Sequence, residues 1–174
     1  MAKIGFTKLG LKLNQEVKNI TINEQDIEVK QYLPINDKLE LISNVINLAA
    51  DANNFMNPIK LKIFLTLEMI EAYTNLNFTE KQKEDPAKIY DLLSSNGIID
   101  TIFNAIPEVE VYYLQEGVFD SADAIYTYKN SVLGILETVT ADYSSMNLDA
   151  SNIQQALSDP DNLSLLRDVL AKLG

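Results

Sequence analysis

Paired carboxylates are the groups in this chain whose spacing suggests chemistry. Glu108 and Glu110 are separated by one residue, and Asp120 and Asp123 by two. Two carboxyl groups about 5–10 Å apart can divide general acid and base work around a sugar, but that reaction also needs a cleft. The sequence marks no cleft, and such pairs arise by chance among 25 acidic residues. We therefore interpret these acids as solvated loop and helix-cap residues rather than as catalysts.

Imidazole and thiol side chains are absent. The chain has no His and no Cys, which removes imidazole and thiol catalysis, disulfides and thiolate metal sites. The acids do not follow the order of an EF-hand loop, and no phosphate-binding loop ends in Gly-Lys-Ser or Gly-Lys-Thr. Asp120, Asp149 and Asp161 stand where helices are expected to begin, and there a carboxylate accepts backbone N–H groups. We expect no enzyme activity, no cofactor and no metal.

Tyrosines lie among the same acids. Such amphipathic aromatic residues are enriched at binding hot spots, but they also occur in cores with the hydroxyl group at the rim. The core interpretation is favoured for Tyr128 and Tyr143, which fit an apolar helical stripe. The others suggest an exposed acidic and aromatic surface that binds a partner. Its candidate residues are Glu108, Glu110, Tyr112, Tyr113, Asp120, Asp123 and Tyr126.

The net charge of −11 is unevenly distributed along the chain. Residues 1–88 hold 11 Lys and 12 acidic residues, whereas residues 89–174 hold 13 acidic residues and three basic ones. An acidic surface repels phosphate backbones, so direct nucleic-acid binding is not expected. No apolar stretch approaches the ~20 residues of a membrane span, and residues 1–6 do not resemble a signal peptide. We expect an intracellular protein that does not bind membranes.

The elements that position these residues begin with extended chain. Leu9, Leu11 and Leu13 alternate with other residues, which predicts a strand with three leucines on one face. Two further alternating runs flank residues 23–26, which predicts a hairpin with a four-residue loop built on a type I turn. Pro34 ends the second strand.

The hairpin has an apolar face that either docks on the helices or pairs with another chain. An exposed edge strand can capture a strand of a partner through its backbone groups. The candidate contact residues of the hairpin are Ile20, Ile22, Ile27 and Val29.

Helical periodicity replaces alternation after Pro34. The expected start signals are a capping box at Asp37 and Glu40, an N-cap at Asn57 before Pro58, and a capping box at Thr79 and Gln82. Asn96 and Gly97 form a helix stop signal. The longest apolar stripe runs from near Asp120 to Tyr143 and predicts a central helix of about six turns. Two short helices are expected after it, beginning at Asp149 and Pro160.

These elements predict a mainly α fold. It is a bundle of six or seven helices with a small N-terminal β-hairpin or three-stranded piece, which makes the class α+β. Residues 1–34 form the hairpin region, and residues 35–174 form a helical domain that is one compact unit.

Residues 27–45, with the sequence IEVKQYLPINDKLELISNV, carry a resemblance to a known class of protein. Together with residues 21–23 they resemble small proteins encoded among the morphogenesis genes of tailed phages of low-GC Gram-positive hosts. A hairpin that leads into a helical domain is also similar to tail assembly chaperones. The resemblance is strongest over residues 16–80. It contains no catalytic motif, so it assigns a role to no particular residue.

Three functions are open. The first is a non-enzymatic phage assembly protein of the tail-assembly-chaperone type, which the resemblance implies would hold a tape-measure or tail-tube protein in the cytoplasm of the host cell. The second is a structural protein of the virion, in the tail or neck, that forms a ring of its own copies. The third is an acidic inhibitor that imitates nucleic acid towards a basic host protein.

Overall fold

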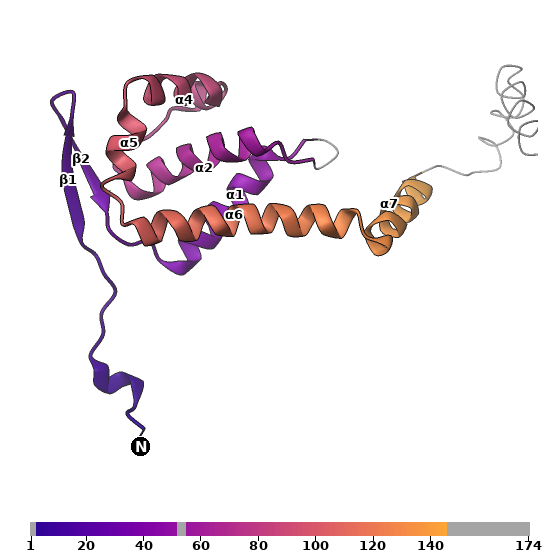
Figure 1. Cartoon of the computed structure of the whole chain (residues 1–174), viewed down its shortest axis with the longest axis horizontal. Helices are drawn as coiled ribbons and strands as arrows, with labels where there is room; N and C mark the ends of the chain where they lie inside the picture. Colours follow the sequence, from indigo (N-terminus) through magenta and orange to yellow (C-terminus); the bar gives the residue numbers. More distant parts are fainter. Residues whose placement is uncertain (1–2, 52–54, 146–174) are drawn as a thin grey trace, which may run out of the picture. The chain divides into compact units, whose positions relative to one another are not determined.

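A computed structural model of the chain describes residues 3–51 and 55–145 (Figure 1). Its elements in chain order are the 3-10 helix η1 (Phe6–Leu9), strands β1 (Val17–Ile22) and β2 (Gln25–Lys30), and helices α1 (Ile35–Ala49), α2 (Pro58–Tyr73), α3 (Glu80–Lys83), α4 (Pro86–Ser95), α5 (Ile98–Phe103), α6 (Glu108–Lys129) and α7 (Val132–Ser145). Seven α-helices and one N-terminal hairpin in the described part confirm the predicted fold class. The chain divides into two compact units, Met1–Tyr126 and Thr127–Gly174.

The hairpin turns its apolar face towards the helices of the first unit. Ile20 lies opposite Ile27 in the antiparallel register. Ile27 and Val29 are buried, and Ile20 and Ile22 pack against the same core. Val29 also forms an isolated bridge with Thr74, just after α2. An isolated two-stranded hairpin is marginal in water, so this docking is what stabilises it.

The turn of the hairpin is tighter than the sequence suggests. Asn23 and Glu24 have φ angles of 48° and 64°, which is the left-handed pair of a type I′ turn. The predicted four-residue loop is therefore wrong, because Gln25 and Asp26 belong to β2 and pair with β1. A type I′ turn follows the twist of its strands, and Thr21 Oγ1 adds a hydrogen bond of 3.1 Å to Asp26 Oδ1.

The described residues before the hairpin do not form a third strand. Residues 6–9 form η1, and residues 10–16 are neither helix nor strand. The predicted strand containing Leu9, Leu11 and Leu13 is thus not formed. Gly10 has a φ of 62°, which glycine adopts readily and which turns the chain out of the extended conformation. We call residues 3–16 the N-terminal arm.

Helix α2 runs through the centre of the first unit. Its buried residues lie on most sides of the helix and are Leu61, Leu65, Thr66, Leu67, Met69, Ile70 and Tyr73. Helix α1 buries a single stripe of Leu41, Val45 and Ala49 against it, and α6 contributes Leu114 and Val118 to the same core. Burial of this apolar surface is the main favourable term that holds α1, α2, α6 and the hairpin together.

Local signals set several helix ends as predicted. Asn57 is the N-cap of α2, and its Oδ1 accepts a hydrogen bond of 2.8 Å from the backbone N–H of Ile59. Pro58 occupies the first position of this helix. Gly97 has a φ of 70° after the end of α4, the left-handed conformation expected of a C-terminal glycine.

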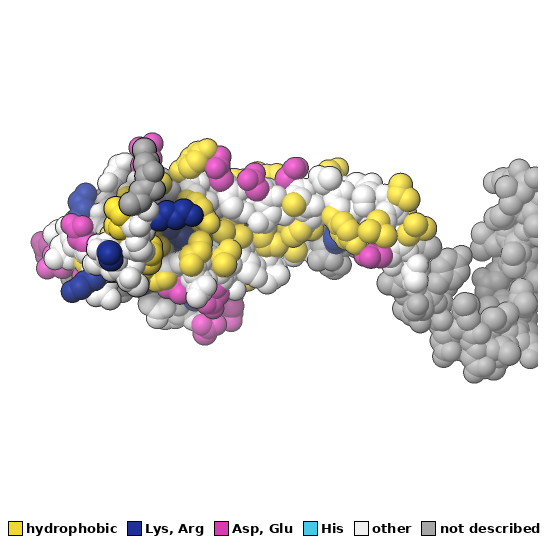
Figure 2. Space-filling view, turned by 90° about the horizontal axis from the view of Figure 1, so that it is seen from below, with side chains coloured by type: hydrophobic (Ala, Val, Ile, Leu, Met, Phe, Trp, Pro, Cys, Tyr) yellow, Lys and Arg dark blue, Asp and Glu magenta, His cyan; other side chains and the backbone are white. Residues whose placement is uncertain are grey.

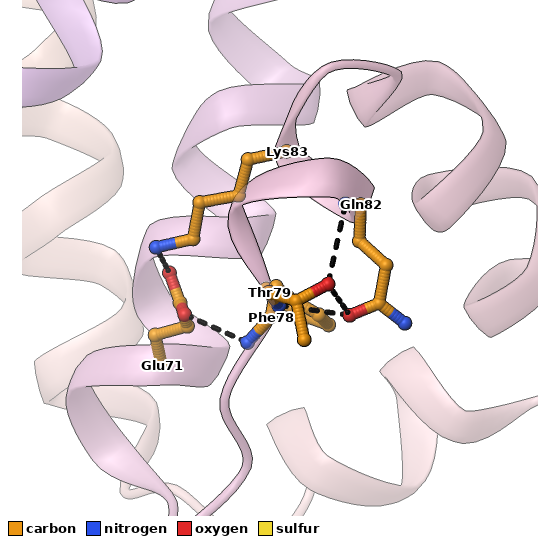
Figure 3. Close-up of polar contacts among 5 residues, drawn as sticks. All are labelled: Glu71, Phe78, Thr79, Gln82 and Lys83. Atoms are coloured by element: carbon orange, nitrogen blue, oxygen red, sulfur yellow. Dashed lines mark hydrogen bonds and ion pairs between the residues drawn. The ribbon is translucent and has the colours of Figure 1, made fainter.

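The start of α3 has the predicted capping box (Figure 3). The side chain of Thr79 accepts from the backbone N–H of Gln82, and Gln82 Oε1 accepts from the backbone N–H of Thr79 at 2.8 Å. Glu71 of α2 joins this turn, since its carboxylate accepts from the N–H of Phe78 at 3.0 Å and pairs with Lys83 Nζ at 2.9 Å. Caps and one ion pair therefore attach the short helix α3 to the end of α2.

Helix α1 begins earlier than predicted. Pro34 occupies its N-cap position, and no side chain caps the helix. The predicted capping box of Asp37 and Glu40 is therefore wrong. Asp37 instead lies in the first turn of α1, where its negative charge complements the helix dipole.

The predicted central helix from Asp120 to Tyr143 is also wrong, because α6 begins directly after Pro107 and a break separates it from α7. At the break, Ser131 Oγ accepts from the backbone N–H of Gly134 at 3.1 Å, and this capping bond starts a new helix. The helices expected at Asp149 and Pro160 lie outside the described residues.

Candidate protein-binding surfaces

Glu110 does not belong to the predicted acidic surface. It is only 6% exposed. Its carboxylate accepts hydrogen bonds from Lys38 Nζ at 2.7 Å, from Tyr73 Oη at 2.7 Å and from the backbone N–H of Leu33 at 3.0 Å. The donors belong to α1, to α2 and to the segment after β2, so this one carboxylate joins three parts of the first unit to α6. The prediction of a partner contact is wrong for Glu110.

The surroundings of Glu110 keep its carboxylate charged. Burial raises the pKa of Glu110, but the hydrogen bonds from Lys38, Tyr73 and Leu33 outweigh burial and lower the pKa below its ordinary value. Burial and then the bond to Glu110 raise the pKa of Tyr73, which keeps that hydroxyl protonated and donating. The group is therefore a structural ion pair, and the hydrogen bonds described for its carboxylate all come from within the chain.

Tyr113 takes part in the same arrangement from the outside. Lys38 Nζ lies 4.6 Å from the ring centroid of Tyr32 and 5.1 Å from that of Tyr113, within the range of cation–π attraction. Tyr113 is half exposed. One face of its ring lies against the Lys38 ammonium group, and Tyr113 stands at the border of the surface described next.

The remaining candidate acids and tyrosines of α6 share one exposed face of this helix. Positions three and four apart lie one above another on a helix, and a run of such positions starts at Glu108. Tyr112, Phe119 and Tyr126 are 58%, 43% and 59% exposed. We call this surface the α6 face. Its residues are Glu108, Val109, Tyr112, Glu116, Phe119, Asp120, Asp123 and Tyr126.

The α6 face is acidic as well as aromatic. No basic residue occurs in the sequence between Lys88 and Lys129. The hydroxyl of Tyr112 donates to the Glu116 carboxylate, which raises the pKa of Tyr112. Figure 2 shows acidic side chains beside hydrophobic ones over the surface of the helical part. Such a face favours an occupant that has apolar groups and positive charge together.

Three residues of this face were missed by the sequence analysis. Val109, Glu116 and Phe119 lie on the α6 face because α6 begins at Glu108. The helix was expected to begin near Asp120, which left residues 108–119 without a helical register. Pro107 was the signal that could have corrected this, because a proline directly before a helix commonly marks its start.

A groove adjoins the α6 face. Its volume is about 370 Å³, and it is lined by Phe55, Met56, Pro58, Leu61, Phe119, Ala122, Asp123 and Tyr126. Three aromatic rings and four other apolar side chains line the groove together with one carboxylate. The groove lies between the start of α2 and α6, within the first unit. It can receive an apolar side chain and hold a cation at its rim.

The candidate residues of the hairpin are used within the chain. Ile27 and Val29 are buried in the core, and Ile20 and Ile22 pack on its border. The prediction of a direct partner contact is therefore wrong for Ile27 and Val29. Lys30 is used internally too, since its Nζ donates to the backbone carbonyl of Ala72 at 2.9 Å.

The N-terminal arm is an exposed apolar segment of the first unit. Its apolar residues Ile4, Phe6, Leu9, Leu11 and Leu13 are between 56% and 76% exposed. The arm also carries Lys3, Lys8 and Lys12, and no acidic residue occurs before Glu16. Large apolar side chains in such a row mark an interaction site in a folded protein.

Tyr128 lies in the second unit and is exposed rather than in a core. Its hydroxyl donates to Glu137 Oε2 at 2.6 Å, and this bond raises the pKa of Tyr128. The prediction that Tyr128 is a core residue is therefore wrong. The prediction for Tyr143 is not tested, because its side chain is not among those that the structure describes.

Other kinds of site find little support in the described residues. Within residues 3–51 and 55–145, no three acidic side chains come together as metal ligands. None of the helices described there is long and apolar enough to cross a bilayer. A hollow beside α4 is lined mainly by apolar side chains, among them Phe78, Ile89 and Leu92, together with Lys81, Asp85 and Lys88.

Comparison of the chain with protein-family models, with curated proteins and with solved structures found no match.

Proposed function

We propose that this chain is a non-enzymatic phage assembly protein of the tail-assembly-chaperone type, which holds another morphogenesis protein through the α6 face. The observation that carries the proposal is the α6 face itself: aromatic rings and carboxylates are exposed together along about five turns of one helix, beside an apolar groove. Interfaces are enriched in aromatic anchors surrounded by a polar rim.

The buried polar groups support a binding role over catalysis. Glu110 accepts three internal hydrogen bonds and is shielded from solvent. On the exposed side of α6, the hydroxyl of Tyr112 donates to the Glu116 carboxylate, which is a hydrogen bond between two surface groups of one helix. A general acid or base needs a perturbed pKa in a cleft that admits substrate. Burial and then Glu71 raise the pKa of Glu68, which lines a hollow of about 300 Å³ with Glu71. None of the residues that line this hollow belongs to the α6 face.

The tape-measure and tail-tube proteins are the partners that the resemblance over residues 16–80 implies. A chaperone of this kind should keep such a partner in solution before assembly. The acidic charge of the face suits that role, because net charge opposes aggregation of the complex.

Co-expression tests this function. The wild-type chain should increase the soluble fraction of the tape-measure or tail-tube protein and co-purify with it. Phe119→Ala together with Tyr126→Ala should lower the affinity about 30-fold or more, if these rings are hot spots. Leu92→Ala is the matched control, since Leu92 is 57% exposed on α4 and lies outside the face. Equal binding by all three chains would contradict the proposal.

A structural virion protein of the tail or neck is the second candidate. It is favoured by the presence, on one chain, of a basic apolar arm and an acidic apolar groove. Mass spectrometry of purified particles separates the two functions, because a structural protein is found there at fixed stoichiometry and a chaperone is absent.

A further inference from the structure

We propose that the N-terminal arm of one copy binds the α6 face and its groove on a second copy of this chain. The contact is heterologous, because each copy contributes a different surface to it. It uses the same face as the proposed function, and the two are tested separately below.

Charge complementarity is the first support. The arm carries Lys3, Lys8 and Lys12, and its one acidic residue, Glu16, lies at its end beside β1. The α6 face carries four carboxylates on a segment that has no basic residue. Opposite fields of this kind direct association and fix the register of a contact. Residues 146–174 suit the face less well, because their sequence has four acidic and two basic residues.

Apolar complementarity is the second support. None of the described residues of the arm is buried within its own chain. Its large apolar side chains Ile4 and Phe6 are 74% and 76% exposed. The groove is lined by Phe55, Phe119 and Tyr126 with Asp123 among them. A large apolar arm side chain fits a cavity of this kind, with a neighbouring lysine placed against the carboxylate.

A heterologous contact has a consequence for assembly. After two copies associate, one arm and one α6 face stay unoccupied, so further copies can be added. Such contacts give closed rings or open chains, according to the rotation between neighbours. This property would let a partner that takes the α6 face end the self-association.

The test is sedimentation velocity of the full-length chain over a range of concentrations. An arm variant combines Phe6→Ala, Leu9→Ala and Leu11→Ala, and a face variant combines Phe119→Ala and Tyr126→Ala. The wild type should associate, and each variant alone should show a dissociation constant raised about 30-fold or more. A mixture of the two variants should form a 1:1 dimer and stop there, because only one intact arm and one intact face remain.

Several outcomes would overturn the proposal. The first is a wild type that stays monomeric at all concentrations. The second is an arm variant that associates with itself as strongly as the wild type does, which would mean that two faces bind each other. The third is a face variant that does the same, which would mean that two arms bind each other. Leu39→Ala and Leu92→Ala serve as controls, since both residues are more than half exposed on other helices. Circular dichroism of all variants shows whether the fold is kept.

The proposed function can fail independently. If the arm variant is monomeric and still binds the tape-measure or tail-tube protein, both proposals stand. If it associates as the wild type does while the face variant loses the partner, the arm contact is wrong and the function is supported. If the mixture forms the 1:1 dimer but no chain binds either phage protein, the self-association stands and the function is wrong.

Discussion

Lys38 and Glu110 form an ion pair at 2.7 Å with side chains that are 7% and 8% exposed. Removing two charges from water is costly, and it is offset here by the rings of Tyr32 and Tyr113 beside the cation and by two further donors to the carboxylate. Removal of one partner would leave the other charge buried without compensation.

Replacement of Glu110 tests how much the buried ion pair contributes to stability. Glu110→Ala should reduce the free energy of unfolding by about 3–5 kcal/mol, the usual cost of breaking a buried pair. Chemical denaturation followed by circular dichroism measures it. Glu108→Ala is the matched control on the same helix and should change stability by less than about 0.5 kcal/mol. Similar losses in both variants would contradict the role assigned to the pair.

The same residue should make stability depend on pH. The folded-state pKa of Glu110 lies below its ordinary value of 4.5, so the unfolded chain takes up the proton first as pH falls. Its contribution is thus fully present above about pH 5 and is lost as pH falls through the lower, folded-state pKa. Between pH 6 and pH 3, the wild type should therefore lose more unfolding free energy than Glu110→Gln does. Parallel curves for the two chains would be inconsistent with this.

At the scale of elements, the hairpin combines a strained turn with good pairing. Glu24 adopts a φ of 64°, a left-handed conformation that costs a residue with a side chain about 1 kcal/mol relative to glycine. Pairing of β1 with β2 and burial of Val29 hold the turn in place. The apolar side of the hairpin consequently belongs to the core.

Glu24→Gly should stabilise the protein, because glycine adopts the left-handed conformation without strain. The expected gain is about 0.5–1 kcal/mol, read from the midpoint of thermal or denaturant unfolding. Glu28→Gly is the control in the adjoining strand, where glycine should instead cost about 0.5–1 kcal/mol. A loss of stability in Glu24→Gly would indicate a different turn.

At the scale of the whole molecule, acidic charge and exposed apolar groups have different consequences for binding. A complex formed mainly by charge, as an imitator of nucleic acid would form, weakens steeply as salt is raised, because the Debye length falls from about 10 Å at 0.1 M to about 3 Å at 1 M. The α6 face combines four carboxylates with three exposed aromatic rings, and apolar burial does not depend on screening.

We therefore expect partner binding to persist at high salt with a moderate loss. Titration calorimetry with the tape-measure or tail-tube protein at 0.1 M and 1 M salt measures this. Asp120→Asn with Asp123→Asn should reduce the salt dependence, whereas Phe119→Ala should reduce affinity at both salt concentrations. Complete loss of binding at 1 M salt would favour the imitator function instead.

Local patterns in the sequence determined much of this protein. Apolar periodicity along α1 and α2, the cap at Asn57, the capping box at Thr79 and the stop at Gly97 each depend on residues within a few positions, so they could be predicted without a fold. The alternation that predicts the hairpin and the absence of His and Cys also need no tertiary information.

Only the tertiary structure decided which side of α6 is buried. Glu108 and Glu110 look alike in sequence, but Lys38, Tyr73 and Leu33, which are 37 to 77 residues away, take Glu110 into the core. The conformation of Glu24 likewise depends on strand pairing and on burial of Val29. Contacts between distant parts of a chain outweigh local preference where burial is at stake, and for this reason they separated the structural carboxylate from those left on the surface.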